Sequence, residues 1–284
     1  MDELTPGRYY ASEQYLLPAD EAETARLGLQ HRVFSKSFEN RISLAPLNLQ
    51  SGGRVLESAA GTGIWALEFF KESSKNGIVL DMECIDISDK QFPQKFPPNV
   101  HFSVRSVIDL PAEWNSNFSY VHQRLLVLAL DDSLWRKVIS EFFRVLLPGG
   151  WLELVEIDTS CYRDYVGPCT NSLQSLALSM FAEKGIIVDM ANYFPPLLEE
   201  TGFVDVRCEV RRVRIGQSGE NGYRSDEIGN FFRGLKRDVV NGGGYGIVRT
   251  EEDYEELLKG CELEWNIHSD EAYVYHYAFL ARKP

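Results

Sequence analysis

The sequence predicts an α/β protein built on one wound, mostly parallel sheet, and three observations support this prediction. Short apolar runs typical of buried strands occur at 54–58, 78–86, 100–104, 118–122 and 151–157. Helical patterns lie between several of these runs, at 63–71 and 133–147, which indicates strand–helix–strand units. A late pair of strands, at 203–214 and 272–281, indicates that the last strand is antiparallel.

Helical segments precede this sheet and interrupt it after the fifth strand. A helix is predicted over 19–38, where apolar residues recur on one face. We expect residues 1–50 to form an N-terminal helical cap segment and residues 51–284 to form the α/β domain. The helical insert of that domain, which should complete the cap, is predicted at about 159–200 and 217–268.

Composition and charge exclude several function classes. The 284 residues include 29 Lys and Arg against 42 Asp and Glu, a net charge of −13 that repels phosphate backbones and anionic lipids. We therefore expect no nucleic-acid partner and no membrane partner. The N-terminus is too acidic for a secretory signal, and no apolar run approaches the ~18 residues of a membrane span. Five cysteines without a CxxC spacing indicate reduced thiols and no zinc site, which favours the cytoplasm.

The segment VLESAAGTGIWAL at 55–67 carries the clearest functional signal. It consists of an apolar strand, a turn of small residues and the start of a helix. Small residues allow the backbone to approach a ligand closely, and a helix N-terminus offers unpaired N–H groups with partial positive charge. Gly61 to Ala66 matches the dinucleotide pattern G-x-G-x-x-A, although a tight strand-to-helix turn can produce the same letters by itself.

Two acidic residues narrow the choice of ligand. Asp86 ends the second predicted strand, 23 positions after Gly63, where such folds bring a carboxylate to a ribose diol; a surface or capping aspartate is the alternative. A nicotinamide dinucleotide and S-adenosylmethionine both use this arrangement. Glu57 lies four positions before Gly61, and a carboxylate there suits a cationic ammonium and sulfonium better than a pyrophosphate.

A set of segments then resembles one protein family across nearly the whole chain. The set is YLLPADEAETARLGLQHRVF (15–34), VLESAAGTGIWAL (55–67), CIDIS (84–88), PPNVHF (97–102), YVHQR (120–124), LLPGGWLELVE (146–156), LEETGFVDV (198–206) and the final ARKP. It resembles the fungal LaeA-like (UMTA-type) branch of the class I S-adenosylmethionine-dependent methyltransferases. The resemblance implies a Rossmann-like fold and S-adenosylmethionine as the cofactor.

The resemblance also implies a role for individual residues. Those expected around the methionine part of the cofactor are Glu57, Ala59, Gly61, Gly63, Gln123 and Arg124. Those expected around the adenosine part are Asp86 at the ribose and Ile87, Ser106 and Val107 at the adenine. Tyr15 would cap the site. His122, at the end of strand four, is the candidate general base, weighed evenly against a structural hydrogen bond.

Two positions depart from the family pattern. Ala59 stands at the family's first loop glycine, and we expect it to be compatible with cofactor binding if its φ is negative. Arg105 and Ser106 replace the acidic pair usual after strand three, so Ser106 offers the adenine amino group an uncharged acceptor.

The predicted function is methyl transfer from S-adenosylmethionine to an O, N or S atom of a small molecule in fungal specialised metabolism. Two alternatives remain open. One is a LaeA-like regulatory or interaction protein with little turnover, which would place the chain in the nucleus as well. The other is a methyltransferase-fold protein that catalyses a non-methylating step.

Overall fold

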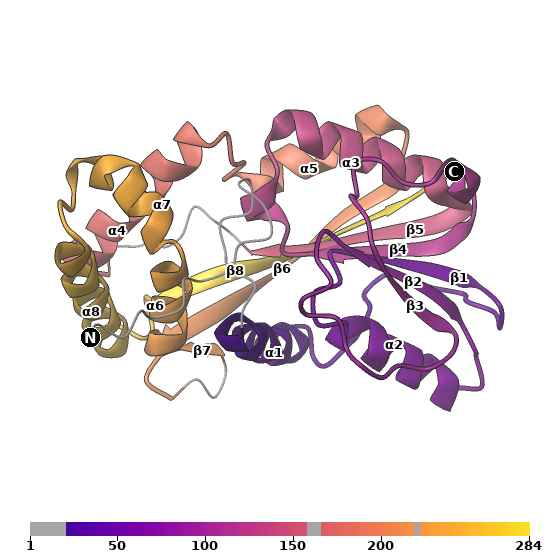
Figure 1. Ribbon diagram of the computed structural model, residues 1–284, viewed down its shortest axis with the longest axis horizontal. Coiled ribbons are helices and arrows are strands. Elements are labelled where there is room, and N and C mark those ends of the chain that lie inside the picture. Colours follow the sequence, from indigo (N-terminus) through magenta and orange to yellow (C-terminus); the bar gives the residue numbers. More distant parts are fainter. Residues whose placement is uncertain (1–20, 158–165, 219–221) are drawn as a thin grey trace, which may run out of the picture.

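One eight-stranded sheet organises the chain. The computed structural model describes residues 21–157, 166–218 and 222–284. Within them the strands are β1 (Arg54–Ser58), β2 (Asp81–Asp86), β3 (Val100–Val104), β4 (Phe118–Arg124), β5 (Leu146–Ile157), β6 (Val204–Gly216), β7 (Gly222–Arg224) and β8 (Tyr273–Arg282). Their order is β3-β2-β1-β4-β5-β8-β6-β7 (Figure 1). Strands β1 to β5 pair in parallel and β8 is antiparallel to both β5 and β6, which confirms the predicted fold class.

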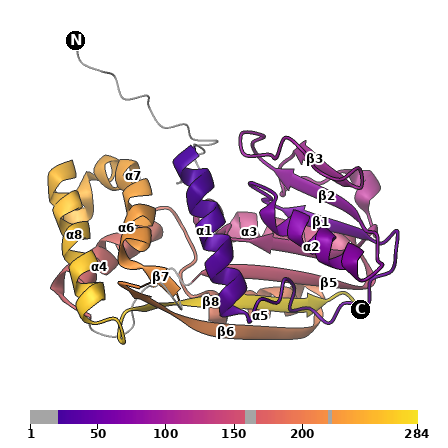
Figure 2. The ribbon, with the colours of Figure 1, turned by 90° about the horizontal axis from the view of Figure 1, so that it is seen from below.

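Helices cover both faces of the sheet and gather at one end of it. They are α1 (Glu21–Ser37), α2 (Ile64–Lys75), α3 (Asp132–Val145), α4 (Pro168–Glu183), α5 (Met190–Thr201), α6 (Ser225–Gly234), α7 (Lys236–Asn241) and α8 (Glu251–Ile267). Helix α2 lies on one face, and α3 and α5 lie on the other (Figure 1). Helices α4, α6, α7 and α8 form a separate group, and α1 runs between that group and the parallel strands (Figure 2).

Helix α3 shows how the sequence produces these layers. The Asp131 side chain accepts the backbone N–H of Leu134 at 2.9 Å and so caps the helix. Apolar side chains then recur at i, i+3, i+4 and i+7, which places them on one face, against the sheet. They are Trp135, Val138, Ile139 and Phe142, all fully buried. On the opposite face, Trp65 and Phe69 of α2 pack in a second core with Tyr120 of β4.

Several predicted boundaries differ from the structure, and two of the differences have a clear structural cause. Helix α3 ends at Val145 instead of residue 147, because Leu146 already begins β5 and pairs with Phe118 before a register shift. The predicted insert at 217–268 also contains strand β7, which pairs with the end of β6. Three residues are too few to show an apolar run, so this strand had no signal in the sequence.

Helix α1 is fixed to the sheet through a buried histidine. The Phe34 ring stacks on His276 of β8 at 3.7 Å, and Ser37 Oγ lies 2.9 Å from His276 Nδ1. The other ring nitrogen of His276 lies 3.2 Å from the hydroxyl of Tyr223 in β7. These contacts place α1 across the carboxyl ends of the parallel strands.

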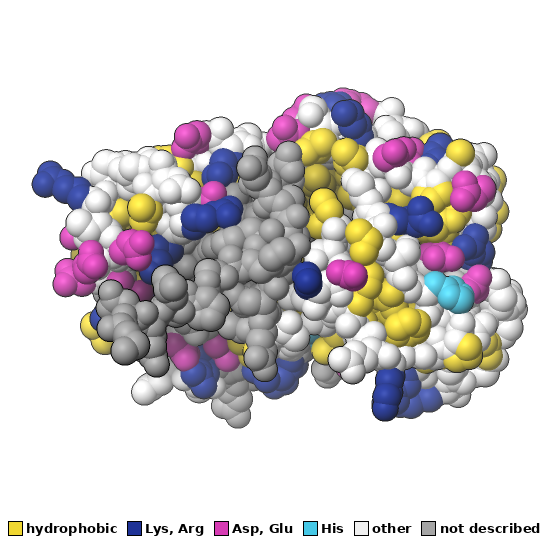
Figure 3. Space-filling model, in the orientation of Figure 1, with side chains coloured by type: hydrophobic (Ala, Val, Ile, Leu, Met, Phe, Trp, Pro, Cys, Tyr) yellow, Lys and Arg dark blue, Asp and Glu magenta, His cyan; other side chains and the backbone are white. Residues whose placement is uncertain are grey.

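The outer surface carries both apolar and charged side chains. Figure 3 shows hydrophobic side chains gathered over the half of the molecule that holds β1 to β5, with charges of both signs around them. In the described part of the chain, no helix is both long enough and apolar enough to cross a membrane.

Candidate functional site

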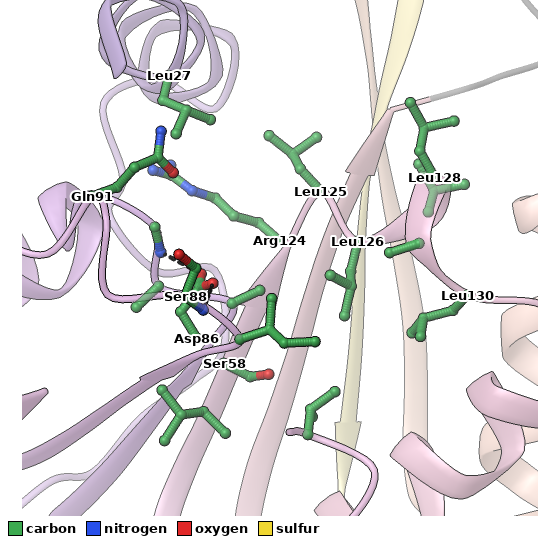
Figure 4. Close-up of a pocket in the computed structure, with 18 of the residues that line it drawn as sticks. Leu27, Ser58, Asp86, Ser88, Gln91, Arg124, Leu125, Leu126, Leu128 and Leu130 are labelled. Carbon is green, nitrogen blue, oxygen red and sulfur yellow. Dashed lines mark hydrogen bonds between the residues drawn. The ribbon is translucent and has the colours of Figure 1, made fainter. Parts of the chain in front are cut away.

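A cavity of about 320 Å³ opens at the carboxyl ends of the parallel strands (Figure 4). Its walls come from α1, from the turns that follow β1 to β4, and from α6. Open α/β sheets bind ligands at this edge, and small-molecule sites typically enclose about 300–1,000 Å³. The position and the size of this cavity therefore both suit a small ligand.

The turn between β1 and α2 forms the floor of the cavity. Gly61 has a φ of +52° and Gly63 a φ of +69°, the left-handed conformation that favours glycine. A Cβ atom on Gly63 would also collide with the ring of Phe102. Ala59 has a φ of +53°, so the negative φ on which its compatibility with the cofactor was made conditional is not observed. Alanine thus holds the conformation of the glycine it replaces, at a strain of about 1–2 kcal/mol.

Asp86 joins the end of β2 to this turn. Its Oδ2 accepts the backbone N–H of Gly61 at 2.8 Å, and its Oδ1 accepts that of Ser88 at 3.2 Å (Figure 4). Burial raises the pKa of Asp86, and these backbone hydrogen bonds act in the opposite direction. Each carboxylate oxygen has a second lone pair, so Asp86 can accept further hydrogen bonds from a ligand in the cavity that it lines.

Glu57 and His122 lie behind the cavity and do not line it. His122 Nδ1 is 2.5 Å from Glu57 Oε2, and the His122 ring stacks on Trp65 at 3.6 Å. Burial lowers the pKa of His122 well below its usual range and raises that of Glu57. Neither side chain lines the cavity, so the expected contact of both residues with ligands stays a prediction, and the observed contact is the one between His122 and Glu57.

Arg124, in contrast, reaches the cavity from the end of β4 (Figure 4). One guanidinium nitrogen lies 2.9 Å from Nδ1 of His31 on α1, and His31 Nε2 lies 2.9 Å from Glu68 Oε2. Burial lowers the pKa of Arg124 while Glu57 raises it, and an arginine remains charged at physiological pH in either case. Gln123 points elsewhere and accepts the Ser58 hydroxyl at 3.1 Å.

Comparison with known proteins decides the family. A family model described as "Methyltransferase domain" matches residues 29–207, more than half of the chain. The chain belongs to this methyltransferase family.

Individual relatives agree with the match. The "Secondary metabolism regulator laeA" of Gibberella zeae is 28% identical, over 98% of this chain and 91% of the relative. The "N-methyltransferase gliN" of Aspergillus fumigatus is 27% identical, over 88% of this chain and 90% of the relative. The predicted family and the predicted class of enzyme are thereby confirmed.

A solved structure shares the fold of this methyltransferase. Haemonchus contortus phosphoethanolamine N-methyltransferase 2, in complex with S-adenosyl-L-methionine, superposes with a TM-score of 0.50 at 13% identity. The match covers 96% of this chain and 55% of that chain, so the present methyltransferase spans about half its length. At this identity the comparison supports the fold alone.

The structure brings most of the predicted cofactor residues together. Those that line the cavity are Ala59, Gly61, Asp86, Ile87, Ser106, Val107 and Arg124. Gly63 does not line it and instead lies at the N-cap position directly before α2. Tyr15 lies outside the described residues, so its predicted role as a cap stays a prediction.

Several lining residues were not anticipated from the sequence. Leu27 and Gln30 of α1 line the cavity, and so does the apolar run 125–130 after β4. The run is visible in the sequence, but its place in the fold was not. The cavity lining could be predicted only if the position of α1 across the sheet were known. No local sequence pattern encodes that position.

The cavity of this methyltransferase suits the predicted cofactor on structural grounds. The Asp86 carboxylate and the positive-φ turn at Gly61 lie on one side, as an adenosine requires. Gln30 lines the cavity and its buried Oε1 has no hydrogen-bond partner in the described structure, so the amide can still bond to a ligand.

Proposed function

We propose that this methyltransferase transfers the methyl group of S-adenosylmethionine to a nucleophilic atom of an apolar small molecule. The observation that carries the proposal is the two-sided cavity. Asp86 and the turn at Gly61 form a polar side, and the run 125–130 with Phe231 forms an apolar side. An apolar wall of this extent beside the cofactor residues favours an acceptor with an apolar skeleton.

A buried glutamate side chain holds the apolar wall in place. Glu156 of β5 accepts the backbone N–H of Leu126 at 2.9 Å and that of Val127 at 3.3 Å. Burial raises the pKa of Glu156 to about 8, and the two hydrogen bonds oppose that rise. The wall is therefore anchored to the sheet, which supports a preformed acceptor site.

The chain's own residues contribute to the reaction mainly by positioning. The cofactor supplies a methyl group on a sulfonium, which is already a good leaving group. Asp86 binds and orients the cofactor, while the apolar wall holds the acceptor and excludes water. The two reacting atoms are thereby held in line. Positioning of this kind can supply about 7–11 kcal/mol of a reaction barrier.

The relatives support a role in fungal specialised metabolism. One of them is named an N-methyltransferase, and another is named a regulator of secondary metabolism. The regulator matches 98% of this chain, so a regulatory protein with little turnover is the second candidate function. The enzyme would act in the cytoplasm, and the regulator would also enter the nucleus.

Calorimetry with S-adenosylmethionine and S-adenosylhomocysteine tests the proposal. We expect both ligands to bind and NAD not to bind. Asp86→Ala should lower both affinities by about 10- to 1,000-fold, because charge-assisted hydrogen bonds contribute about 1.5–3 kcal/mol each. Asp81→Ala is the matched control, since Asp81 begins the same strand and does not line the cavity.

The outcomes separate the candidates. Binding of NAD without binding of either sulfur ligand at millimolar concentration contradicts the cofactor assignment. The regulatory function is supported by a different result, obtained in extracts of a strain that makes the metabolites. There the protein binds the cofactor and captures a protein partner, but no methylated product forms.

A further inference from the structure

Strand β6 forms an open edge of the sheet over most of its length. On one side β6 pairs with β8, and on the other side β7 pairs only with residues 214–216. Among the described residues, no strand pairs with the open side of 204–213, which runs along the border of the sheet (Figure 2). A long edge leaves a row of N–H and C=O groups available to another strand.

Backbone contacts show which residues of β6 face this open side. The N–H of Ile215 donates to the carbonyl of Ala272, in the register of the β6–β8 pairing, at 2.9 Å. On the other side, β7 lies against the backbone of Arg214. Successive residues direct these groups to opposite sides, so beyond the register shift near the start of β6 the odd-numbered residues bond to β8. Cys208 and Val210 therefore present their N–H and C=O groups to the open side.

The side chains of this edge are complementary to those of a second copy. When two β6 strands pair antiparallel about a two-fold axis at Cys208, Arg207 lies opposite Glu209 of the second copy. The same register places Val206 opposite Val210, which is 42% exposed. The symmetry repeats each of these pairs. An axis at Arg207 or at Glu209 instead places like charges directly opposite each other, which is destabilising.

The charged residues of this edge can form the new pairs. Exposed Arg207 lies 5.9 Å from the Trp151 ring centroid, and no described carboxylate oxygen lies within 4.0 Å of its nitrogens. Glu209 pairs with Arg41 at 3.1 Å and with Arg211 at 3.0 Å. Its side chain remains 31% exposed, and a carboxylate accepts about four hydrogen bonds, so Glu209 can accept a further N–H group.

We propose that β6 is the dimerisation edge of this methyltransferase. Two copies join antiparallel about Cys208, so that the two sheets become one continuous sheet. A strand pair is smaller than a standard protein interface, so the dimer forms reversibly and depends on protein concentration. No residue of 204–213 lines the cavity, so the dimer does not depend on the proposed function.

The first experiment measures mass by size exclusion with light scattering between about 5 and 200 μM protein. We expect the mass to rise from one chain towards two. Arg207→Glu or Glu209→Arg alone should weaken the dimer about 10-fold, because each places like charges opposite each other, and the two substitutions together should restore it. Arg214→Glu is the matched control, because Arg214 lies where β7 already covers β6 and pairs with Asp270.

The second experiment tests the backbone pairing. Val210→Pro removes an N–H group on the open side and leaves the odd-numbered bonds to β8 in place. We expect this variant to be monomeric, whereas Val210→Ala keeps the N–H group and should stay within about threefold of the wild-type dimer affinity. Thermal unfolding of each variant shows whether the fold is retained.

The third experiment tests the position of the axis. Copper phenanthroline oxidises two opposed Cys208 thiols to a disulfide, which a non-reducing gel shows as a dimer that Cys208→Ser removes. Burial raises the pKa of the Cys208 thiol to about 11, so the reaction is run in mild alkali.

Three results overturn the proposal. A chain that stays monomeric at every concentration shows that the charges of β6 keep this edge unpaired. A dimer that withstands both single charge reversals and Val210→Pro uses another surface. A dimer that does not crosslink through Cys208 has a different axis, such as one at Val210 that would oppose Glu209 to Arg211.

Discussion

His122 Nδ1 lies 2.5 Å from Glu57 Oε2, and the two residues are register partners on the adjacent strands β4 and β1. Each is about 1% exposed. Burial lowers the pKa of His122 and raises that of Glu57, so the ring is neutral near pH 7 and the two side chains share a proton in their hydrogen bond. The pair therefore acts as a structural unit beneath the site.

This pairing predicts strong coupling between the two positions. His122→Phe keeps an aromatic ring beside Trp65 but leaves the buried Glu57 carboxyl group without its hydrogen-bond partner, which should cost about 1–3 kcal/mol in urea unfolding. Glu57→Gln and the variant that carries both substitutions complete a double-mutant cycle. We expect the single costs to be non-additive by more than about 0.5 kcal/mol. Additive costs would contradict the coupling, and a loss of turnover with unchanged stability in His122→Phe would return His122 to the role of general base.

The sequence could predict most of the fold and about half of the site contacts, for physical reasons. The apolar runs and the turn at Gly61 are local, so β1 to β4 and the position of Asp86 followed directly. The direction of the Glu57 side chain could not be predicted from the local sequence, because it depends on β4 lying beside β1. The contact between Arg124 and His31 joins residues 93 positions apart and exists only once α1 crosses the sheet.

The left-handed conformation of Ala59 predicts that a glycine is better at this position. Relief of about 1–2 kcal/mol of strain outweighs the entropic cost of a new glycine, which is about 0.5–1 kcal/mol. Ala59→Gly should therefore stabilise the protein by about 0.5–1 kcal/mol, or ~2 °C in Tm. Ala25→Gly is the matched control, because exposed Ala25 lies inside α1 and its replacement should cost about 1 kcal/mol. Equal destabilisation by both substitutions would contradict the strain at Ala59.

Buried His276 predicts a loss of stability in acid. Burial lowers the pKa of His276 to about 3, whereas an unfolded histidine titrates near 6.5. Below pH ~6.5 the unfolded chain binds a proton that the folded chain does not, so stability falls with pH until about pH 3. Between pH 7.5 and pH 5 this residue should remove about 2 kcal/mol from the free energy of unfolding.

Urea unfolding at the two pH values measures that loss. His276→Gln should reduce the pH-dependent difference by about 2 kcal/mol, because glutamine does not titrate. His268→Gln, at an exposed position after α8, should leave the difference as in the wild type. An unchanged difference in His276→Gln would show that His276 is protonated in the folded state.

Ser106 tests the placement of the adenine. Ser106 lines the cavity on the turn after β3, where the family resemblance implies a carboxylate that accepts the adenine amino group. Ser106→Asp restores that charge, and a charged acceptor should add about 1 kcal/mol to the hydrogen bond, or about fivefold in affinity. The gain should be equal for S-adenosylmethionine and S-adenosylhomocysteine, because both carry the same adenine.

Arg105 is the residue that could offset this gain by pairing with the new aspartate. Its guanidinium already lies 5.4 Å over the Trp114 ring, and its Nε donates to Ser103 Oγ at 3.2 Å. Because Arg105 already has these contacts, we expect most of the gain in affinity to remain. The net charge of −13 also has little effect on the new aspartate, because charges are screened beyond ~8 Å at physiological salt. Ser103→Asp, on β3 and outside the cavity lining, adds the same charge and should give no gain in calorimetry. A tenfold loss in Ser106→Asp alone would place the adenine elsewhere in the cavity and favour the non-methylating alternative.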